Sequence, residues 1–262
     1  MNKLNITVPE ARFTATGNWA VAAPLAGEAE GAQRRRTAMN FQLDMADSGA
    51  LLTRFGLKDA IRNGKGKLEG QVSWDGSPFS PDVPTLGGQF NLNVENGQFL
   101  KADPGLAKLL GVLSLQSLPR RLTLDFRDVF SEGFAFDFVR GDVAIAQGVA
   151  TTNNLQMKGV SVAALLDGRA DIARETQDLR VVVVPEINAL TASLVMTAIN
   201  PAIGLGTLLA QLVLKGPLAQ AATQEFRIDG SWSDPQVTKV ARTGAMPAGS
   251  ATAPDRQPES RP

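Results

Sequence analysis

The chain has 262 residues, of which 44% are hydrophobic, enough to build the core of one large β domain or of two ordinary ones. Lys plus Arg and Asp plus Glu number 26 each, and the resulting net charge of zero argues against a nucleic-acid binder. The sequence has no Cys, His or Tyr, so it lacks disulfides, thiolate nucleophiles and the commonest general base and metal ligand. We therefore expect a protein that is not an enzyme, with no catalytic residue, no cofactor and no metal.

Apolar and polar residues alternate with a period of two over the first 96 residues, which is typical of half-buried β-strands. The alternation starts at Leu4, and no apolar signal peptide precedes it, so we expect the C-terminal piece of a longer chain. A short helix is expected from Asp47 or Ser48 to about Phe55, because both residues are good N-caps. The strands of this part are predicted from apolar positions within 13–21, 41–45, 68–74 and 90–94.

The only basic run of the sequence is Arg34-Arg35-Arg36, in a stretch rich in Gly, Ala and Gln. A run of this kind is usually a solvated turn. The alternative interpretation is a contact with anionic lipid headgroups.

The same alternation returns after residue 120 and is interrupted by turns rich in Gly, Asn and Asp, as in an antiparallel meander. A second helix is expected after Asp103-Pro104. Leu179 to Val184 is almost continuously apolar, so both faces of that strand are expected to be covered. Residues 239–262 are rich in Ala, Pro, Gly and Ser and are expected to be disordered. The strands of this part are predicted from positions within 122–126, 134–138, 143–145, 155–157, 170–172, 179–184 and 226–232.

Residues 187–214 contain no charged side chain. Asn200-Pro201 interrupts this stretch, and each half is too short to cross the ~30 Å hydrocarbon core of a bilayer. We predict two short helices that either pack on the sheet or touch a membrane surface. The candidates for membrane contact are Ile187, Leu190, Leu194, Ile199, Leu205, Leu208, Leu209 and Leu212.

Several blocks of the second half occur in the order found in the C-terminal region of the AsmA-like family, and most closely in its YhdP branch. They are residues 97–99 (GQF), 113–122 (LSLQSLPRRL), 125–134 (DFRDVFSEGF), 179–187 (LRVVVVPEI), 200–207 (NPAIGLGT) and 226–237 (FRIDGSWSDPQV). The sequence resembles this family over residues 97–237, and residues 1–96 fit its β repeats without a specific signature.

The resemblance implies an elongated, twisted antiparallel sheet with an apolar concave groove and a few short helices near the C-terminal end. It also implies a periplasmic, membrane-associated protein that carries phospholipid between the inner and outer membranes and supports the outer-membrane permeability barrier. The family's N-terminal membrane helix is missing from this sequence. If the groove carries lipid, the side chains expected to line it are Leu122, Leu124, Phe126, Phe134, Phe136 and Phe138; the alternative is that Ala135, Asp137 and Val139 face inward.

Three regions follow from these patterns: a β repeat segment over residues 1–96, a C-terminal β region with capping helices over 97–238, and the tail. The alternative to a lipid conduit is a β-sandwich that serves as a structural or assembly module of the cell envelope and binds no lipid. Bound phospholipid would distinguish the first interpretation from the second.

Overall fold

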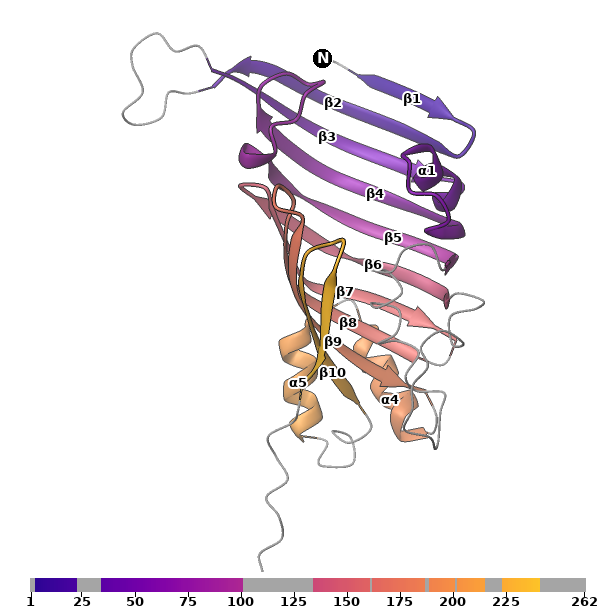
Figure 1. Ribbon diagram of the computed structural model, residues 1–262. Coiled ribbons are helices and arrows are strands. Elements are labelled where there is room, and N and C mark those ends of the chain that lie inside the picture. Colours follow the sequence, from indigo (N-terminus) through magenta and orange to yellow (C-terminus); the bar gives the residue numbers. More distant parts are fainter. Residues whose placement is uncertain are drawn as a thin grey trace, which may run out of the picture.

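The computed structural model describes residues 3–22, 34–100, 134–160, 162–186, 189–200, 202–214 and 223–240. These residues form one antiparallel sheet of eleven strands, in which the spatial order of the strands is their order in the chain (Figure 1). The predicted mainly β, antiparallel fold is confirmed. The strands are β1 (Leu4–Val8), β2 (Ala11–Val21), β3 (Arg35–Met45), β4 (Ile61–Asp75), β5 (Gly87–Phe99), β6 (Phe134–Ala146), β7 (Val149–Gly159), β8 (Val162–Asp171), β9 (Thr176–Pro185), β10 (Gln224–Gly230) and β11 (Pro235–Lys239).

Connections of two to four residues join five of the ten neighbouring strand pairs, and each of these fixes its two strands side by side. Between β6 and β7 the turn is Gln147-Gly148, with φ angles of 50° and 73°. Two positive φ values in a two-residue hairpin correspond to a turn whose twist matches that of the strands. β5 crosses the predicted boundary at residue 96 and pairs with both β4 and β6, so the described strands form a single sheet.

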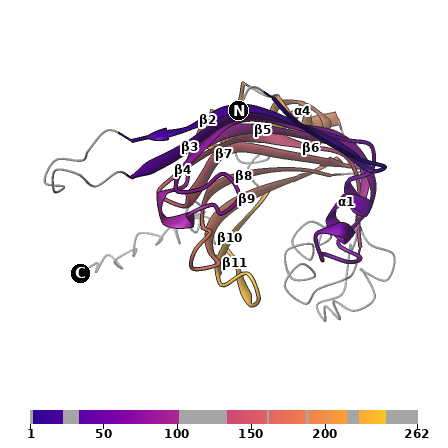
Figure 2. The ribbon, with the colours of Figure 1, turned by 90° about the horizontal axis from the view of Figure 1, so that it is seen from above.

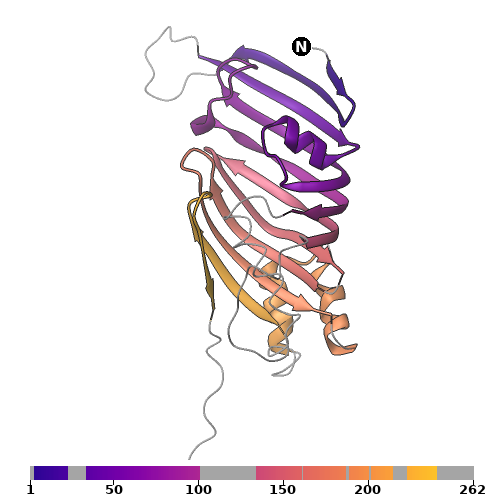
Figure 3. The same cartoon turned by 45° about the vertical axis from the view of Figure 1, so that its right-hand side comes forward.

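The sheet is long, strongly twisted and arched. Its strands run across the molecule at β1 to β6 and turn almost along it at β10 (Figure 1), as the right-handed twist of successive strands accumulates. Seen down the long axis, the sheet forms an arch with a concave side (Figure 2). The view in Figure 3 shows β1 at one end of the molecule and the last strands at the other.

Glycines in the middle of strands allow adjacent strands to approach closely. A Cβ atom added to Gly70 in β4 would overlap the carbonyl oxygen of Gln89 in β5, and one added to Gly17 in β2 would overlap that of Ala38 in β3. No other residue fits at these positions without a shift of the backbone.

Helix α1 (Ser48–Arg54) begins where the sequence predicted it. The Asp47 side chain accepts a hydrogen bond from the Ala50 backbone N–H at 3.0 Å, which caps the first turn. α1 lies on the concave side at one long edge of the sheet (Figure 2), and its buried Leu51 anchors it there. The short 3-10 helix η1 (Val83–Thr85) lies on the same side at the opposite edge.

Helix α4 (Ala189–Ala198) covers the convex side of β8 and β9, and helix α5 (Leu205–Leu214) covers that of β7 and β8. Both faces of β9 are therefore buried: Val181 and Val183 face the concave side, whereas Val182 and Val184 pack under the helices. The prediction that this apolar strand is covered on both faces is confirmed. The two helices also confirm the predicted break at Asn200-Pro201.

Two other predictions fall on residues outside the described ones. These are the helix after Asp103-Pro104 and the disordered tail over residues 239–262, of which the structure describes only Lys239, the last residue of β11, and Val240.

Candidate functional site: an apolar trough along the sheet

Apolar side chains continue across the concave face from strand to strand. The register pairs Ile6 with Phe13, Phe13 with Leu43, Leu43 with Leu68 and Leu68 with Leu92. A parallel row runs through Ala15, Phe41, Gly70, Phe90 and Val143. Strands lie about 4.8 Å apart, so each row, which crosses four strand spacings, extends for about 19 Å. We call this concave apolar surface the trough.

The trough is open at its N-terminal half. Most large apolar side chains of β2 to β5 that face it are only half-buried, with Trp74 and Val94 as buried exceptions, and Ile6 of β1 is 50% exposed. Phe13 and Phe41 stack side by side there, with ring centroids 6.2 Å apart. A single sheet that leaves so much contiguous apolar surface uncovered marks an interaction surface. The half-buried residues are Phe13, Met39, Phe41, Leu43, Leu68, Val72, Phe90 and Leu92.

The C-terminal half of the same face is a closed core. Phe136 of β6 is 3% exposed, and its ring lies 4.9 Å from that of Phe99. The concave side chains of β7 to β10 pack around it into one buried cluster. Exposed apolar surface therefore runs along β1 to β5, and the strands that follow close that end. The buried members of the cluster are Val94, Phe136, Met157, Val162, Ala164, Val181, Val183, Phe226 and Ile228.

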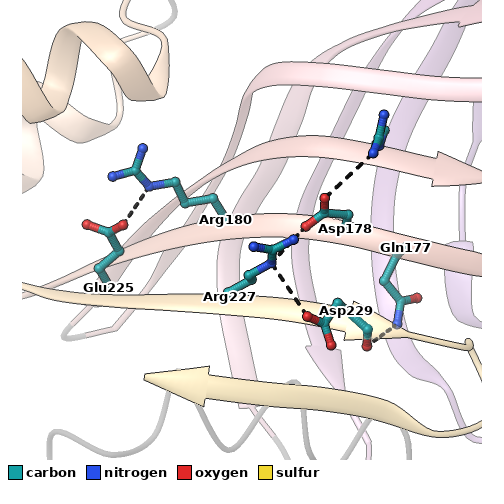
Figure 4. A network of polar contacts seen from close by, with 7 residues as sticks. Gln177, Asp178, Arg180, Glu225, Arg227 and Asp229 are labelled. Atoms are coloured by element: carbon teal, nitrogen blue, oxygen red, sulfur yellow. Dashed lines mark hydrogen bonds and ion pairs between the residues drawn. The ribbon is translucent and has the colours of Figure 1, made fainter. Parts of the chain in front are cut away.

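The convex face is polar, and its charges are paired. Arg180 in β9 meets Glu225 in β10 at 2.6 Å, and Arg227 lies 3.1 Å from Asp178 and 3.5 Å from Asp229 (Figure 4). All of these side chains except Asp229 line an open cavity of about 690 Å³. Three arginines and three carboxylates line it, so the cavity has no net charge that would select an ion. Two of its ion pairs join β9 to β10.

The corner between α4 and α5 is fixed to the convex face by two side chains of the sheet. Arg140 in β6 donates to the carbonyl oxygen of Ile199 at 2.6 Å, and Gln156 in β7 donates to that of Asn200 at 2.6 Å. These bonds satisfy carbonyl groups that the end of a helix leaves without an intrahelical partner. Gln156 also accepts from Arg140 at 3.3 Å and is 1% exposed, so the contact is buried.

The predicted groove residues occupy three different environments. Leu122, Leu124 and Phe126 lie outside the described residues. Phe134 packs at the edge of the buried cluster and Phe136 lies inside it, both on the concave side. Phe138 does not share their face.

A register shift between Phe136 and Phe138 explains this difference. Phe138 is opposite Glu95 and stacks under the Arg140 guanidinium, whose Cζ is 4.2 Å from the ring centroid. Val139 takes its place on the concave side, where it packs against the buried cluster. Uniform alternation, on which the grouping of the three phenylalanines rested, could not anticipate the shift.

The predicted membrane-contact residues are mostly turned toward the sheet. Leu194, Leu205 and Leu208 are at most 1% exposed and pack on the convex side of β8 and β9, which differs from the expectation of membrane contact. Ile199 and Leu209 flank the same cluster. Ile187 and the side chains of Leu190 and Leu212 lie outside the described residues. The large side chain that α4 does expose is Met196, which is 67% exposed.

The open trough residues of β2 to β5 were not selected as site residues from the sequence. Their alternation was recognised, but the resemblance drew attention to residues after 97. The signal that identifies them is the strict alternation of polar and apolar residues in β4. Lys67, Glu69 and Gln71 lie on one face of this strand, and Leu68 and Val72 lie on the other.

Among the described residues, no helix is both long and apolar enough to cross a bilayer. The same residues contain no group of three or more potential metal-ligating side chains.

Comparisons with known proteins agree with this geometry. The family model described as YhdP protein matches residues 1–237. The intermembrane phospholipid transporter YhdP of Escherichia coli strain K12 is 30% identical over 233 residues, which cover 88% of this chain and 18% of that protein. The chain thus spans about a fifth of the length of that relative. No solved structure matches.

Proposed function

The chain belongs to the YhdP family, and on that premise we propose that its trough carries the acyl chains of phospholipids without any enzymatic step. The observation that carries the proposal is the open apolar surface of β1 to β5, which no described element covers in full. Exposing such a surface to water is costly, and hydrocarbon chains are the natural partner for a surface that offers so few polar groups.

The difference in polarity between the two faces of the sheet supports the same proposal. The concave face is apolar from β1 to β10, whereas the convex face of β2 to β5 carries Thr, Asn, Gln, Lys and Glu side chains. A protein that transports lipid along a surface needs one face for the chains and another for water. A phospholipid whose tails lie in the trough can keep its headgroup at an edge, in contact with solvent.

We further propose that this function takes place in the periplasm, as part of phospholipid exchange between the inner and outer membranes. The relative's name supports intermembrane transport for that protein. The uncharged helical pair, with exposed Met196 on α4, supports a shallow contact with a membrane or a membrane protein at the C-terminal end. In this proposal the two helices close the convex side of β7 to β9 and present their outer surface.

The test is phospholipid that co-purifies with the chain, quantified by mass spectrometry of lipid extracts. Leu68→Asp places a charge in the open trough, where it reaches water, so the protein should fold and lose most of its lipid. Gln71→Asp, on the convex face of the same strand, is the matched control and should keep its lipid.

The contrary result is a folded wild-type chain with no bound phospholipid after expression in bacteria. It would support the alternative of a structural or assembly module. Equal lipid in both variants would show that the trough is not the binding surface.

A further inference from the structure

One edge of the trough gathers exposed aromatic and apolar side chains beside a cation. Trp19 and Val21 at the end of β2 are 47% and 55% exposed, and Phe79 in the connection from β4 to η1 is 87% exposed. Arg35, at the start of β3, is directly opposite Val21. We call Trp19, Val21, Arg35, Pro78 and Phe79 the Trp19 rim.

Arg35 has an unusual position in the charge pattern of the sheet. Strand register places nearly all charged residues of the described strands on the convex face; the exceptions on the concave face are Arg35 and, in the last strand, Lys239. Arg35 is therefore the one charged residue that strand register aligns with the open half of the trough. It stands at the end of its strand, where the apolar surface meets water.

The guanidinium of Arg35 is oriented by an aromatic ring. Its Cζ lies 4.5 Å from the centroid of the Trp19 ring. No carboxylate of the described residues forms an ion pair with it, whereas neighbouring Arg34 meets Asp75 at 3.2 Å and Arg36 donates to Ser73 at 2.8 Å on the convex face. Stacking on an indole leaves the N–H groups at the edge of the guanidinium available to an anion.

A cavity opens beside Trp19, the residue whose ring the Arg35 guanidinium contacts. It has a volume of about 280 Å³ and is lined by Trp19, Met39 and Pro78, together with Thr37 and backbone around Gly17. Two hydrogen bonds hold the covering connection in place: Trp74 Nε1 donates to the carbonyl oxygen of Ser77, and Thr37 Oγ1 donates to that of Gly76, each at 2.8 Å. The cavity is mostly apolar, and its lining includes Met39, which also faces the trough.

We propose that the Trp19 rim is a phospholipid headgroup site, in which Arg35 binds the phosphate and the cavity beside Trp19 receives the first part of an acyl chain. The proposal rests on the proposed function and adds to it the residues that recognise the phosphate. A guanidinium forms short, charge-assisted hydrogen bonds to phosphate oxygens. An indole suits the boundary between apolar chains and water.

The experiment compares two lipids with the same acyl chains, phosphatidylglycerol and diacylglycerol, each titrated from detergent micelles into the purified chain and its variants. Arg35→Gln should weaken phosphatidylglycerol binding by about tenfold, because one charge-assisted contact is lost. Diacylglycerol has no phosphate, so its binding should stay within about twofold. Arg36→Gln removes the same charge from the convex face one residue away and should leave both lipids unaffected.

Three outcomes would overturn the headgroup site. The first is that Arg35→Gln and Arg36→Gln weaken phosphatidylglycerol binding equally. The second is that Arg35→Gln weakens the binding of both lipids equally. The third is that inorganic phosphate displaces phosphatidylglycerol fully, which would indicate a site for free phosphate. Failure of the wild-type chain to bind either lipid would contradict the proposed function itself. Binding of both lipids that is insensitive to Arg35→Gln would contradict the headgroup site alone.

Discussion

At the residue scale, the shape of the sheet depends on positions that lack a side chain. Gly70 lies between Phe41 and Phe90 in adjacent strands, and the carbonyl oxygen of Gln89 occupies the place of its missing Cβ. Gly70→Ala should therefore lower the free energy of unfolding by roughly 1–3 kcal/mol, the usual cost of overpacking. Gly206→Ala in α5 is the control, since nothing lies within 4 Å of its added Cβ.

Urea denaturation measures both variants. The control should be unchanged or more stable by up to about 1 kcal/mol, because Ala favours helix over Gly. Similar stability of Gly70→Ala and the wild type would show that the close approach of β4 and β5 does not constrain the sheet.

A single carboxylate on the convex face should make stability depend on pH. Asn91 and Asn154 donate to Asp142 at 2.9 and 2.8 Å, and these bonds hold the pKa of that carboxyl below its ordinary value. A pKa that is lower in the folded state means that ionisation stabilises the fold. This contribution is complete above the unfolded pKa of about 3.9 and is lost as the pH falls through the folded pKa.

The measurement is the difference in Tm between the wild type and Asp142→Asn. The difference should be largest near about pH 6 and should shrink toward about pH 3. Asp59→Asn, at an exposed position before β4, is the matched control for the loss of one carboxylate. A constant difference at all pH values would contradict the role given to the ionised carboxylate.

At the element scale, the α4–α5 corner depends on a buried amide in β7. Gln156→Leu keeps the approximate volume but removes the donor to the carbonyl oxygen of Asn200 and the acceptor for Arg140. We expect a loss of about 1–3 kcal/mol, since buried polar groups lose their partners. Amide hydrogens of α5 should also exchange faster, because the corner that positions this helix is weakened.

Gln89→Leu is the same substitution at an exposed position on the convex face of β5. It should change stability by less than about 0.5 kcal/mol. If the two variants are equally stable and α5 exchanges at the wild-type rate, the corner does not depend on Gln156.

A strand or helix could be predicted from the sequence where a single local pattern, such as alternation or an N-cap, determines it. Strict alternation identified β2 to β5, the Asp47 cap identified α1, and the apolar run identified β9 as buried on both faces. The direction of the helical leucines could not be predicted, because α4 and α5 are apolar on most sides and suit a sheet or a membrane equally. The face of Phe138 was missed because a register shift has no signature in hydrophobic alternation.

At the scale of the whole molecule, the trough is open at β1 to β5 and closed at the strands that follow. The sequence indicated an apolar concave face through the family resemblance, but not where that face is open. Exposure depends on how far accumulated twist brings β6 to β10 together, and this is a property of the complete sheet. The half-buried rows through Phe41 and Leu43, and not Phe136, are therefore the exposed part of the face, where we propose that lipid binds.

Site-specific photo-crosslinking along β3 tests this account most directly. A photoreactive residue is placed in turn at each position from Ala38 to Leu43, and crosslinked phospholipid is quantified in bacteria that express the chain. Register puts Met39, Phe41 and Leu43 in the trough and the three intervening residues on the convex face. We expect lipid adducts at 39, 41 and 43 and none at 38, 40 and 42. Equal adducts at all six positions, or none at the three trough positions, would contradict the central claim that lipid lies along the concave face.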